Sequence, residues 1–554
     1  KLFRYNKPGW QIWPLRLPIT PVKDPTDPDQ ATIDVNNRVQ LALAQLPQEV
    51  QRMGVSVLKK SSSMLQIIFL TSPDQRYNTI YLSNYALLNI VDELKRLPGV
   101  GDAKNFAAQD YSMRVWLKPD VMSQLGVTPE DIATALRDQN AQFAAIKVMT
   151  DLVQEYGYYS SGESFTIADP NEIWIMEMIG KGPGVRGAVW VAVRIPDDCI
   201  SAHANQSRIH QFDMNDKNNC LYSSDVISFA REKGYFTGVN KDFSFADAYA
   251  PLDFGARRYC EARVWSYFNM FTDRGEEFLP YIEGKTDQPM PLYLKANRKI
   301  SVQDVKNAMR DHYEGTPLDI SKDFGAGPYH TPYRLSPLSF KVNGQEYFNE
   351  RPISTQQSGF VFVSQMRSTM PDAIGGVLWF GTDDANMTVF TPVYCCTDKV
   401  PVCYSRVDGA DYITFSWNSS FWIFNWVANM VYPRYDLMIG DVRASQSEME
   451  TTFNDAQEGI ESAASKLYSK DPARAKEFLT NYTNMTAQST LDTWKRLGEF
   501  LIVKYNDGVV KRMKDGKFER NSIGQPAGVI RPGYPKEFLE EYVKQTGDRY
   551  KMPE

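Results

Sequence analysis

The sequence predicts a protein of the α+β class, and three observations support this prediction. Two segments with strand alternation, residues 163–169 and 172–178, are joined by the turn residues at 169–171, and this pattern predicts a β-hairpin. Residues 445–505 contain few runs of β-branched residues and are expected to be helical. Helical and strand patterns also follow one another in the first third of the chain. Sheets and helices in separate parts of the sequence are typical of layered α+β folds.

The first third begins with residues 1–26, which are rich in proline and are expected to form an extended arm of unassigned function. The pattern then predicts, in order, a helix, a strand, a helix, two strands and a helix, at residues 36–46, 54–70, 79–97, 102–106, 111–117 and from Thr128 onward. This order predicts a split βαβ subdomain of the ferredoxin type.

Six short motifs in this region occur together in one order and spacing. They are DPDQ at 27–30, LPQEV at 46–50, GVSV at 54–57, GVGD at 99–102, LGVTP at 125–129 and DQNAQ at 138–142. Together they resemble the porter domain of a resistance-nodulation-division multidrug efflux pump, over residues 27–145. The resemblance implies a periplasmic subdomain that lines the drug path of a trimer. The membrane helices of that family have no counterpart in this sequence, so this segment is not expected to transport anything alone.

The helical period continues past residue 145. It predicts an apolar stripe, closed by Gly157, whose members are Ile146, Met149, Leu152, Val153 and Tyr156. A helix from Pro129 to Tyr156 would have roughly 28 residues, well above the usual length of about 11 or 12. This length favours two helices from different proteins that are joined near residue 145. A single long natural helix is the alternative.

The remainder of the chain contains further strand and helix patterns. Strands are expected at residues 189–195, 375–381, 389–394 and 412–417. Residues 421–431 predict a buried helix, and the helical region 445–505 is expected to break at Asp471 and Pro472. This order of elements predicts a region of sheet that is followed by a helical C-terminal arm.

Four segments of this remainder also occur together. They are ESFTIAD at 163–169, the Trp190 strand that runs into RIPD at 194–197, HANQ at 203–206 and the stretch 417–429. They resemble the Ntn-hydrolase dipeptidases that act as cysteine peptidases. The resemblance covers about residues 146–554 and implies an αββα sandwich that lacks its N-terminal part. It divides this region into a core at 146–440 and a helical C-terminal region at 441–554, and it implies a bacterial protein that is periplasmic or secreted.

The same resemblance implies a catalytic mechanism. Its nucleophile is an N-terminal Cys whose own α-amine is the general base. The oxyanion then needs a hydrogen-bond donor, and Asn205 matches the oxyanion-type Asn of the family. An Asn that satisfies the backbone of a turn is the alternative. No cysteine precedes Cys199 in this sequence, so we expect the nucleophile to be absent and the chain as written to be inactive.

Other candidate residues come from charge and thiol patterns. Arg257, Arg258 and Arg263 lie near Glu261 on an expected helix and could bind a dipeptide carboxylate through two hydrogen bonds. A solvated or salt-bridged helix face is the alternative. The thiols of Cys395, Cys396 and Cys403 are expected either to form a loop disulfide or to be buried and inert. The acidic pair at 197–198 is expected to belong to a turn.

Composition limits the classes of function. The chain has 61 Lys and Arg against 67 Asp and Glu, a net charge of -6, which argues against a nucleic-acid partner. No apolar run of about 18 residues occurs, so no membrane span is expected in this chain. No phosphate loop or zinc-type spacing is found, so we expect no cofactor and no metal. The sequence opens on Lys1 without a signal-peptide pattern, and we expect a processed chain or a fragment.

Three hypotheses about function remain open at the level of sequence. The chain is a dipeptidase by resemblance, with a dipeptide as substrate and with its nucleophile missing. Alternatively, it is a periplasmic porter fragment of a multidrug efflux transporter, for which a homo-oligomer is an open option. The third hypothesis is an artificial or mis-assembled hybrid of the two. All six cysteines and all four histidines lie beyond residue 198, which agrees with two sequences of different origin.

Overall fold

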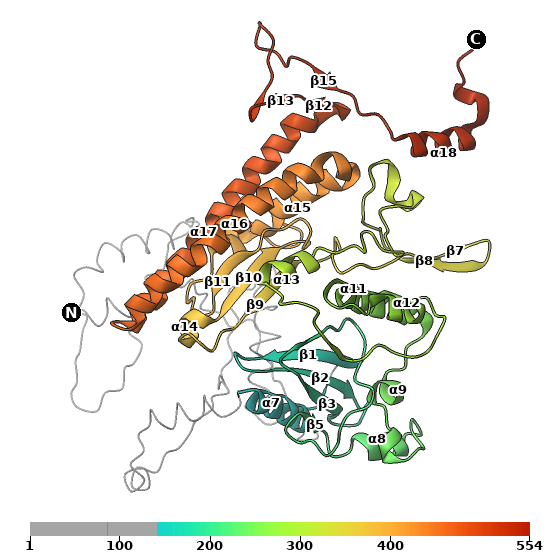
Figure 1. Cartoon of the computed structure of the whole chain (residues 1–554), viewed down its shortest axis with the longest axis vertical. Coiled ribbons are helices and arrows are strands. Elements are labelled where there is room, and N and C mark those ends of the chain that lie inside the picture. The colour runs from blue at the N-terminus through green and yellow to red at the C-terminus, as the bar shows by residue number, and fades with distance from the viewer. Residues whose placement is uncertain (1–85, 87–140, 159) are drawn as a thin grey trace, which may run out of the picture. The chain divides into compact units, whose positions relative to one another are not determined.

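The computed structural model describes Ala86, residues 141–158 and residues 160–554 (Figure 1). The chain divides between Ile132 and Ala133 into two units, and the fold described below is that of the second unit. Ala86 is helical and lies within the helix predicted at 79–97. The proline-rich arm and the other elements predicted before residue 141 lie outside the described residues.

The described fold begins with helix α7, Ala141–Tyr156. Gly157 ends it in a left-handed conformation, with φ of 93°, and donates its N–H to the Val153 carbonyl. Ile146 is buried, but Leu152 is 49% exposed, so the predicted stripe is wrong at Leu152. The reason is the helical angle: at 100° per residue, Leu152 lies about 240° from Ile146 and faces solvent.

The first sheet has the strand order β1-β2-β3-β5, and every pairing is antiparallel. Its strands are Gly162–Ala168, Ile173–Gly180, Ala188–Ile195 and Cys220–Tyr222. The hairpin predicted at 163–178 is confirmed. Its turn is closed by the Asp169 side chain, which accepts the N–H groups of Asn171 and Glu172.

Both faces of this sheet are covered. Trp174, Met176 and Met178 pack toward Ile146 of α7. On the other face, Ile175 packs in a cluster that includes residues of helices α8, Val226–Glu232, and α9, Phe245–Tyr249. Because strand residues alternate between faces, the buried Glu177 shares the face of Ile175.

A helical layer follows in sequence. It contains α10, Phe254–Ala256, a π-helical turn η3, Arg257–Glu261, then α11, Ala262–Phe271, α12, Gly275–Ile282, and α13, Val302–Ala308. Strand β4, Cys199–Ser201, pairs with β6, Tyr293–Lys295, beside this layer. The capping box of Ser301 and Asp304 fixes the start of α13.

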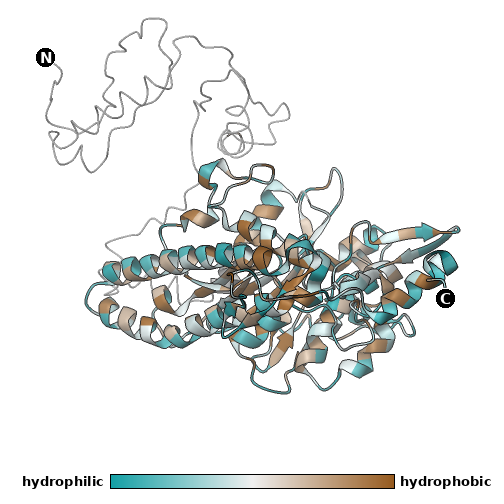
Figure 2. Cartoon of the chain, turned by 90° about the horizontal axis from the view of Figure 1, so that it is seen from above, coloured by the Kyte–Doolittle hydropathy of each residue, from teal (hydrophilic) through white to brown (hydrophobic). Residues whose placement is uncertain are grey.

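The second sheet has the order β11-β10-β9, with strands Thr391–Tyr394, Val377–Thr382 and Phe360–Gln365. Three helices pack against it (Figure 1): α15, Ser420–Val431, α16, Tyr435–Tyr468, and α17, Pro472–Tyr505. Phe424 stacks on Trp494 at a centroid distance of 4.7 Å within this core. Figure 2 shows hydrophobic residues gathered in the strands and hydrophilic residues along the long helices.

The predicted helical arm is confirmed with longer bounds. The break occurs where it was predicted, because Asp471 caps α17 and Pro472 is its first residue. The arm begins earlier than predicted, at Tyr435. No helix in the described part of the chain is both long enough and apolar enough to cross a bilayer.

The strand predicted at 412–417 is wrong. Asp411 and Thr414 form a single bridge around a tight turn, and the Asp411 carboxylate accepts the N–H of Ile413. An Asx turn of this kind bends the backbone too sharply for a strand. The expected strand at 375–381 also starts late, since Gly375 ends the short helix α14, Asp372–Gly375.

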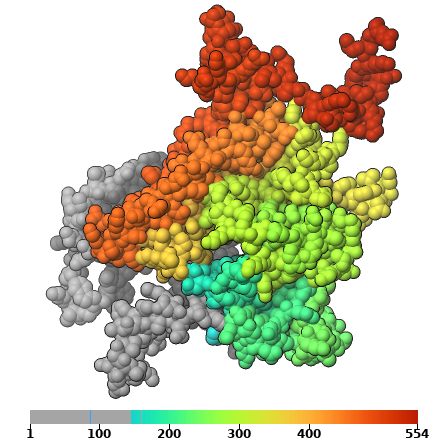
Figure 3. Space-filling model, in the orientation of Figure 1, coloured from blue at the N-terminus to red at the C-terminus, as the bar shows by residue number. Residues whose placement is uncertain are grey.

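Three two-stranded sheets and a helix near the C-terminus complete the described fold. They are β7, Ser339–Val342, and β8, Gln345–Phe348; β12, Val510–Lys511, and β15, Val529–Ile530; β13, Met513–Lys514, and β14, Lys517–Phe518; and α18, Lys536–Thr546. Figure 3 shows the C-terminal residues, in red, projecting from the rest of this unit. Phe538 of α18 stacks on Phe324 at 6.0 Å. The mixture of helices with antiparallel sheets confirms the α+β class, while the αββα sandwich and the ferredoxin-type subdomain stay predictions.

Candidate functional site

The segment that carries Asn205 is fixed by a buried arginine. The guanidinium of Arg208 bonds the Glu261 carboxylate at 3.0 Å, and their side chains are 1% and 4% exposed. It also donates to four backbone carbonyls, those of Ala202, Met290, Pro291 and Leu292. A buried guanidinium with this many acceptors ties the segment after β4 to both the helical layer and the chain before β6.

A second buried carboxylate holds the same segment from the sheet side. Glu177 of β2 accepts the backbone N–H of Arg208 at 2.6 Å and that of Ile209 at 3.1 Å, and it also accepts the Ser207 hydroxyl. Burial raises the pKa of Glu177, against the lowering effect of these hydrogen bonds. We call Glu177, Arg208 and Glu261 the buried anchor.

Asn205 lies in a bend just before the anchored residues and is exposed. Strand β4 ends at Ser201, so Asn205 lies four residues beyond the end of this strand. Its Oδ1 accepts a hydrogen bond from the Arg263 guanidinium at 2.8 Å. Since arginine can only donate, the amide oxygen must face Arg263, which turns the Nδ2 donors outward. No described residue accepts a hydrogen bond from this Nδ2.

Arg263 occupies the first turn of α11, directly after the π-helical turn. Its Nε donates to the Tyr259 carbonyl at 2.8 Å. Burial lowers the pKa of this guanidinium, and the nearby Arg351 acts in the same direction. Neither arginine forms an ion pair with a carboxylate in the described part of the chain. The Asn205–Arg263 site therefore carries uncompensated positive charge, which favours a developing oxyanion or a carboxylate ligand.

The other two predicted arginines are held elsewhere. Arg258 pairs with Glu350 at 2.6 Å, with both side chains largely buried. Arg257 pairs with Asp287 at 3.0 Å and lies over the Tyr281 ring at 4.5 Å. Both guanidiniums are thus engaged by the protein itself, and only Arg263 is brought to Asn205.

The acidic pair at 197–198 is also engaged. Asp197 bonds Arg194 at 2.7 Å, and Asp198 bonds Lys295 at 3.0 Å. Both carboxylates follow strand β3 and lie in the turn that leads into β4. Asp197 therefore pairs with a residue of β3, and Asp198 pairs with a residue of β6.

All six cysteines are free thiols, so the loop disulfide alternative is not formed in this structure. Burial raises the pKa of Cys199, of Cys220 to about 12 and of Cys403 to about 11. It also raises the pKa of Cys395 and Cys396. Because the thiolate is the reactive form, these five thiols are poorly suited to be nucleophiles. Cys260 is buried next to Arg263 and is 6% exposed.

Sequence reasoning missed the residues that position the site. Glu177 was assigned to an ordinary strand, and neither Arg208 nor Arg351 was singled out. A carboxylate inside the apolar run around Trp174 and Met176 was the available signal for Glu177, because an unpartnered charge in a buried strand is costly. His203 lies beside the segment, with Nε2 at 2.8 Å from the Thr166 hydroxyl, and burial lowers its pKa.

Two families match this chain. The model of peptidase family C69 matches residues 104–448. The model of the AcrB/AcrD/AcrF family matches residues 20–182. Residues 104–182 fall within both matches, and the junction predicted near residue 145 lies in this overlap.

Individual relatives fall into the same two groups. A probable dipeptidase from Salmonella dublin is 31% identical over 289 residues, which is 51% of this chain and 59% of that protein. Dipeptidase A from Lactobacillus helveticus is 27% identical over 305 residues, 54% of this chain and 56% of that protein. The multidrug export protein AcrF from Escherichia coli (strain K12) is 45% identical over 120 residues, 22% of this chain and 12% of that protein.

The chain spans somewhat more than half the length of the curated dipeptidases that it matches. Both resemblances seen in the sequence are confirmed by these matches. Because the peptidase model covers more than half of the residues, the chain belongs to peptidase family C69, with a segment similar to the AcrB/AcrD/AcrF family near its N-terminal side.

Proposed function

We propose that residues 146–554 form the substrate-orienting part of a dipeptidase of the N-terminal-nucleophile type. Asn205 would donate to the oxyanion from its Nδ2, and Arg263 would hold the amide in that orientation. The observation that carries this proposal is the 2.8 Å hydrogen bond from Arg263 to the Asn205 Oδ1. Asn205 directly precedes the residues that the buried anchor holds. The similarity to proteins named as dipeptidases supports a dipeptide as substrate.

The positive charge of Arg263 and Arg351 supports this assignment. A tetrahedral intermediate of acyl transfer develops a negative charge on oxygen, and preorganised donors stabilise it. The same charge would also attract the carboxylate of a dipeptide. Arg257 and Arg258 stay weaker candidates for substrate binding, since each already holds a carboxylate of the chain.

We further propose that residues 1–554 hydrolyse no dipeptide by themselves. Residues 20–103 match only the efflux family, and no cysteine precedes Cys199. The five thiols with raised pKa values offer no substitute nucleophile. The site would act only in a complete αββα sandwich. An N-terminal dipeptidase segment would complete that sandwich.

Activity assays can test both parts of the proposal. The purified chain is incubated with a panel of dipeptides, and no turnover is expected. Turnover that thiol alkylation abolishes would overturn the proposed inactivity. In a second experiment, the N-terminal part of the Salmonella dublin relative replaces residues 1–145, and dipeptide hydrolysis is expected to appear.

The role of Asn205 is tested in that hybrid enzyme. Asn205→Ala is expected to lower kcat by about 10²–10³-fold with a much smaller change in KM, as for loss of an oxyanion donor. Asn218→Ala provides a matched control, because Asn218 is an exposed asparagine in the turn that precedes β5. An active hybrid whose kcat is unaffected by Asn205→Ala would contradict the assignment.

A second function is favoured by the 45% identity to AcrF over 120 residues. In this proposal, residues 27–145 keep the ferredoxin-like fold of a porter subdomain in a periplasmic or secreted bacterial protein. Trimer formation or drug binding by the purified chain would support it. The absence of both would count against it.

The proposed hybrid origin has its own test. Peptide mapping with an intact-mass measurement is expected to find a peptide that spans residues 144–147 if one natural polypeptide contains both segments. If no such peptide is recovered from the native source, the sequence is an artificial or mis-assembled hybrid.

A further inference from the structure

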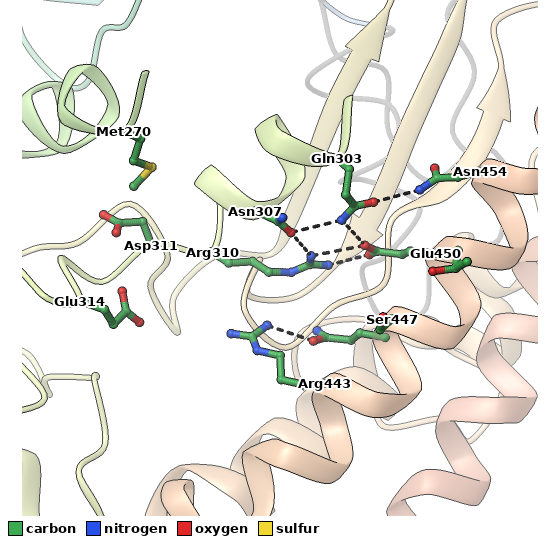
Figure 4. A pocket seen from close by; sticks show the side chains of 12 residues that line it. Met270, Gln303, Asn307, Arg310, Asp311, Glu314, Arg443, Ser447, Glu450 and Asn454 are labelled. Carbon is green, nitrogen blue, oxygen red and sulfur yellow. Dashed lines mark hydrogen bonds and ion pairs between the residues drawn. The ribbon is translucent and has the colours of Figure 1, made fainter. Parts of the chain in front are cut away.

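A pocket of about 560 Å³ lies between α13, the residues that follow it and α16 (Figure 4). We call it the α13–α16 pocket. Asp311 and Glu314 lie on one side of it, and Arg443 and Glu450 come from α16 on the other side. Its volume is within the usual range of small-ligand sites.

One pair of charges in this pocket is satisfied internally. Arg310 bonds Glu450 at 2.6 Å, and the side chains are 9% and 3% exposed. Glu450 also accepts the backbone N–H of Phe390 at 2.9 Å. Opposite charges at this distance cancel, so this pair holds the segment that follows α13 to α16 and leaves little charge for a ligand.

Two other charges lining the pocket have no ionic partner among the described residues. Asp311 accepts the Ser266 hydroxyl at 2.6 Å. Arg443 donates to the Asn386 carbonyl at 3.1 Å and to the Gln446 amide oxygen at 2.9 Å. Each charge is thus oriented by neutral groups only. A carboxylate and a guanidinium therefore line one cavity, each in need of an opposite charge.

Burial and the neighbouring Glu314 carboxylate disfavour the ionised form of Asp311. Burial raises its pKa to about 6, against the lowering effect of the Ser266 hydroxyl. A bound ammonium would favour the ionised carboxylate. Glu314 lies on the same side and is held by His312, whose backbone N–H donates to it at 2.7 Å and whose Nδ1 lies 2.9 Å from its other oxygen.

We propose that the α13–α16 pocket binds a zwitterionic α-amino acid or short peptide, whose ammonium contacts Asp311 and whose carboxylate contacts Arg443. An ammonium has three donors and suits a carboxylate acceptor, while a guanidinium suits a carboxylate. An ion of a single sign would leave the opposite wall unpaired. None of these residues belongs to the Asn205–Arg263 site, so this binding site goes beyond the proposed catalytic role.

Isothermal titration calorimetry on the full chain tests the proposal. The probes are L-alanyl-L-alanine, its N-acetyl derivative, its C-terminal amide and free L-alanine. The dipeptide or the amino acid is expected to bind, and each blocked derivative is expected to bind about 10- to 100-fold more weakly, because each loses one charge-assisted contact. The tighter of the two unblocked probes identifies the ligand size. If no probe binds, or if blocking changes nothing, the proposal is overturned.

Variants assign each end of the ligand. Asp311→Asn is expected to remove the preference for the free amine over the N-acetyl derivative, and Arg443→Gln the preference for the free carboxylate over the amide. These are ratios between two ligands, so general loss of folding does not imitate them. Glu448→Gln on α16 is the matched control, because Glu448 is exposed and does not line the pocket. Unchanged ratios in both pocket variants would overturn the assignment.

The same titration separates this proposal from the proposed function. Asn205→Ala is expected to leave dipeptide binding in the α13–α16 pocket unchanged. If Asn205→Ala weakens binding while Asp311→Asn does not, the pocket proposal fails and the Asn205–Arg263 site is supported. If the pocket ratios hold while the hybrid enzyme shows no role for Asn205, only the proposed catalytic function fails.

Discussion

The buried anchor and the α13–α16 pocket contain the same kinds of side chain, yet they differ in how their charges are satisfied. In the anchor, Arg208 bonds Glu261, and Glu177 accepts backbone N–H groups. In the pocket, Asp311 and Arg443 have only neutral partners among the described residues. A charge whose partners are all internal maintains the fold, whereas a charge that lines a cavity without an opposite charge is available to a ligand. Four predictions test this difference.

The largest effect on the free energy of unfolding is expected from a substitution in the buried anchor. Glu261→Leu leaves the Arg208 guanidinium buried without its carboxylate and is expected to cost about 3–5 kcal/mol in the free energy of unfolding. Chemical denaturation measures this cost. The matched control is Glu277→Leu, which breaks the exposed pair with Arg274 and is expected to cost less than about 1 kcal/mol. Equal costs for the two variants would contradict the structural role of the anchor.

The next effect concerns Lys306, a fully buried cation near the pocket. Its Nζ donates to Asn454 at 3.1 Å and lies 3.5 Å from the centroid of the Trp379 ring. Burial lowers its pKa to about 8. Between about pH 8 and pH 10.5 the unfolded chain holds a proton that the folded chain has lost, so stability is expected to rise with pH.

The pH dependence of denaturation in Lys306→Met checks this prediction. The rise over that pH window, on the order of 1–3 kcal/mol, is expected to disappear in the variant. Lys504→Met is the control variant, because Lys504 is paired with Asp441 at 2.8 Å. This variant is expected to keep the rise in stability with pH. A wild-type curve without a slope above pH 8 would argue against a buried, destabilised ammonium.

A smaller effect is expected at Asp311. Its pKa is raised to about 6, so the folded chain keeps a proton that the unfolded chain loses above about pH 4. Stability is therefore expected to fall as pH rises from about 4 to 6. Asp311→Asn is expected to flatten this slope and to stabilise the free protein at pH 7, by an amount on the order of 1–2 kcal/mol.

The sign of the change at Asp311 is the critical result. A destabilised Asp311→Asn variant at pH 7 would mean that the carboxylate contributes to the fold, as the anchor does. Saturating dipeptide is expected to reverse the order of stability, because only the wild-type pocket gains the ammonium contact. Thermal denaturation with and without the ligand measures both values.

The smallest effect on stability is expected at Asn205. This side chain is exposed and, within the described part of the chain, accepts one hydrogen bond, from Arg263, so Asn205→Ala is expected to change the free energy of unfolding by less than about 0.5 kcal/mol. A change of several kcal/mol would reassign Asn205 to the fold. Loss of kcat in the hybrid enzyme without loss of stability would separate function from folding at this position.

Local patterns in the sequence predicted the elements that depend on local physics. The hairpin at 163–178 follows from two strand patterns and from the turn residues between them, and the helix break at Asp471 and Pro472 follows from capping. The error at 412–417 has a local cause as well. The residues have the composition of a strand, but the Asp411 side chain closes a turn, and no neighbouring strand pairs with this segment among the described residues.

The candidate site was predictable only in part. Asn205 and Arg263 were both chosen from the sequence, yet no pattern indicated that they meet, because they are 58 residues apart. Asp311 and Arg443 were not singled out in the sequence at all. Charged residues on helix faces have the same sequence pattern whether they face solvent, a partner or a cavity, and only the packing of α13 against α16 distinguishes these cases.

The sequence by itself determined the family resemblance, the α+β class and the presence of two unrelated segments. These properties depend on the order and spacing of residues along the chain. The tertiary structure decided which arginine lies against Asn205, which carboxylates are satisfied and which charges line a cavity. Those outcomes depend on distance and burial, since the energy of a charge is set by the groups packed around it rather than by its neighbours in sequence.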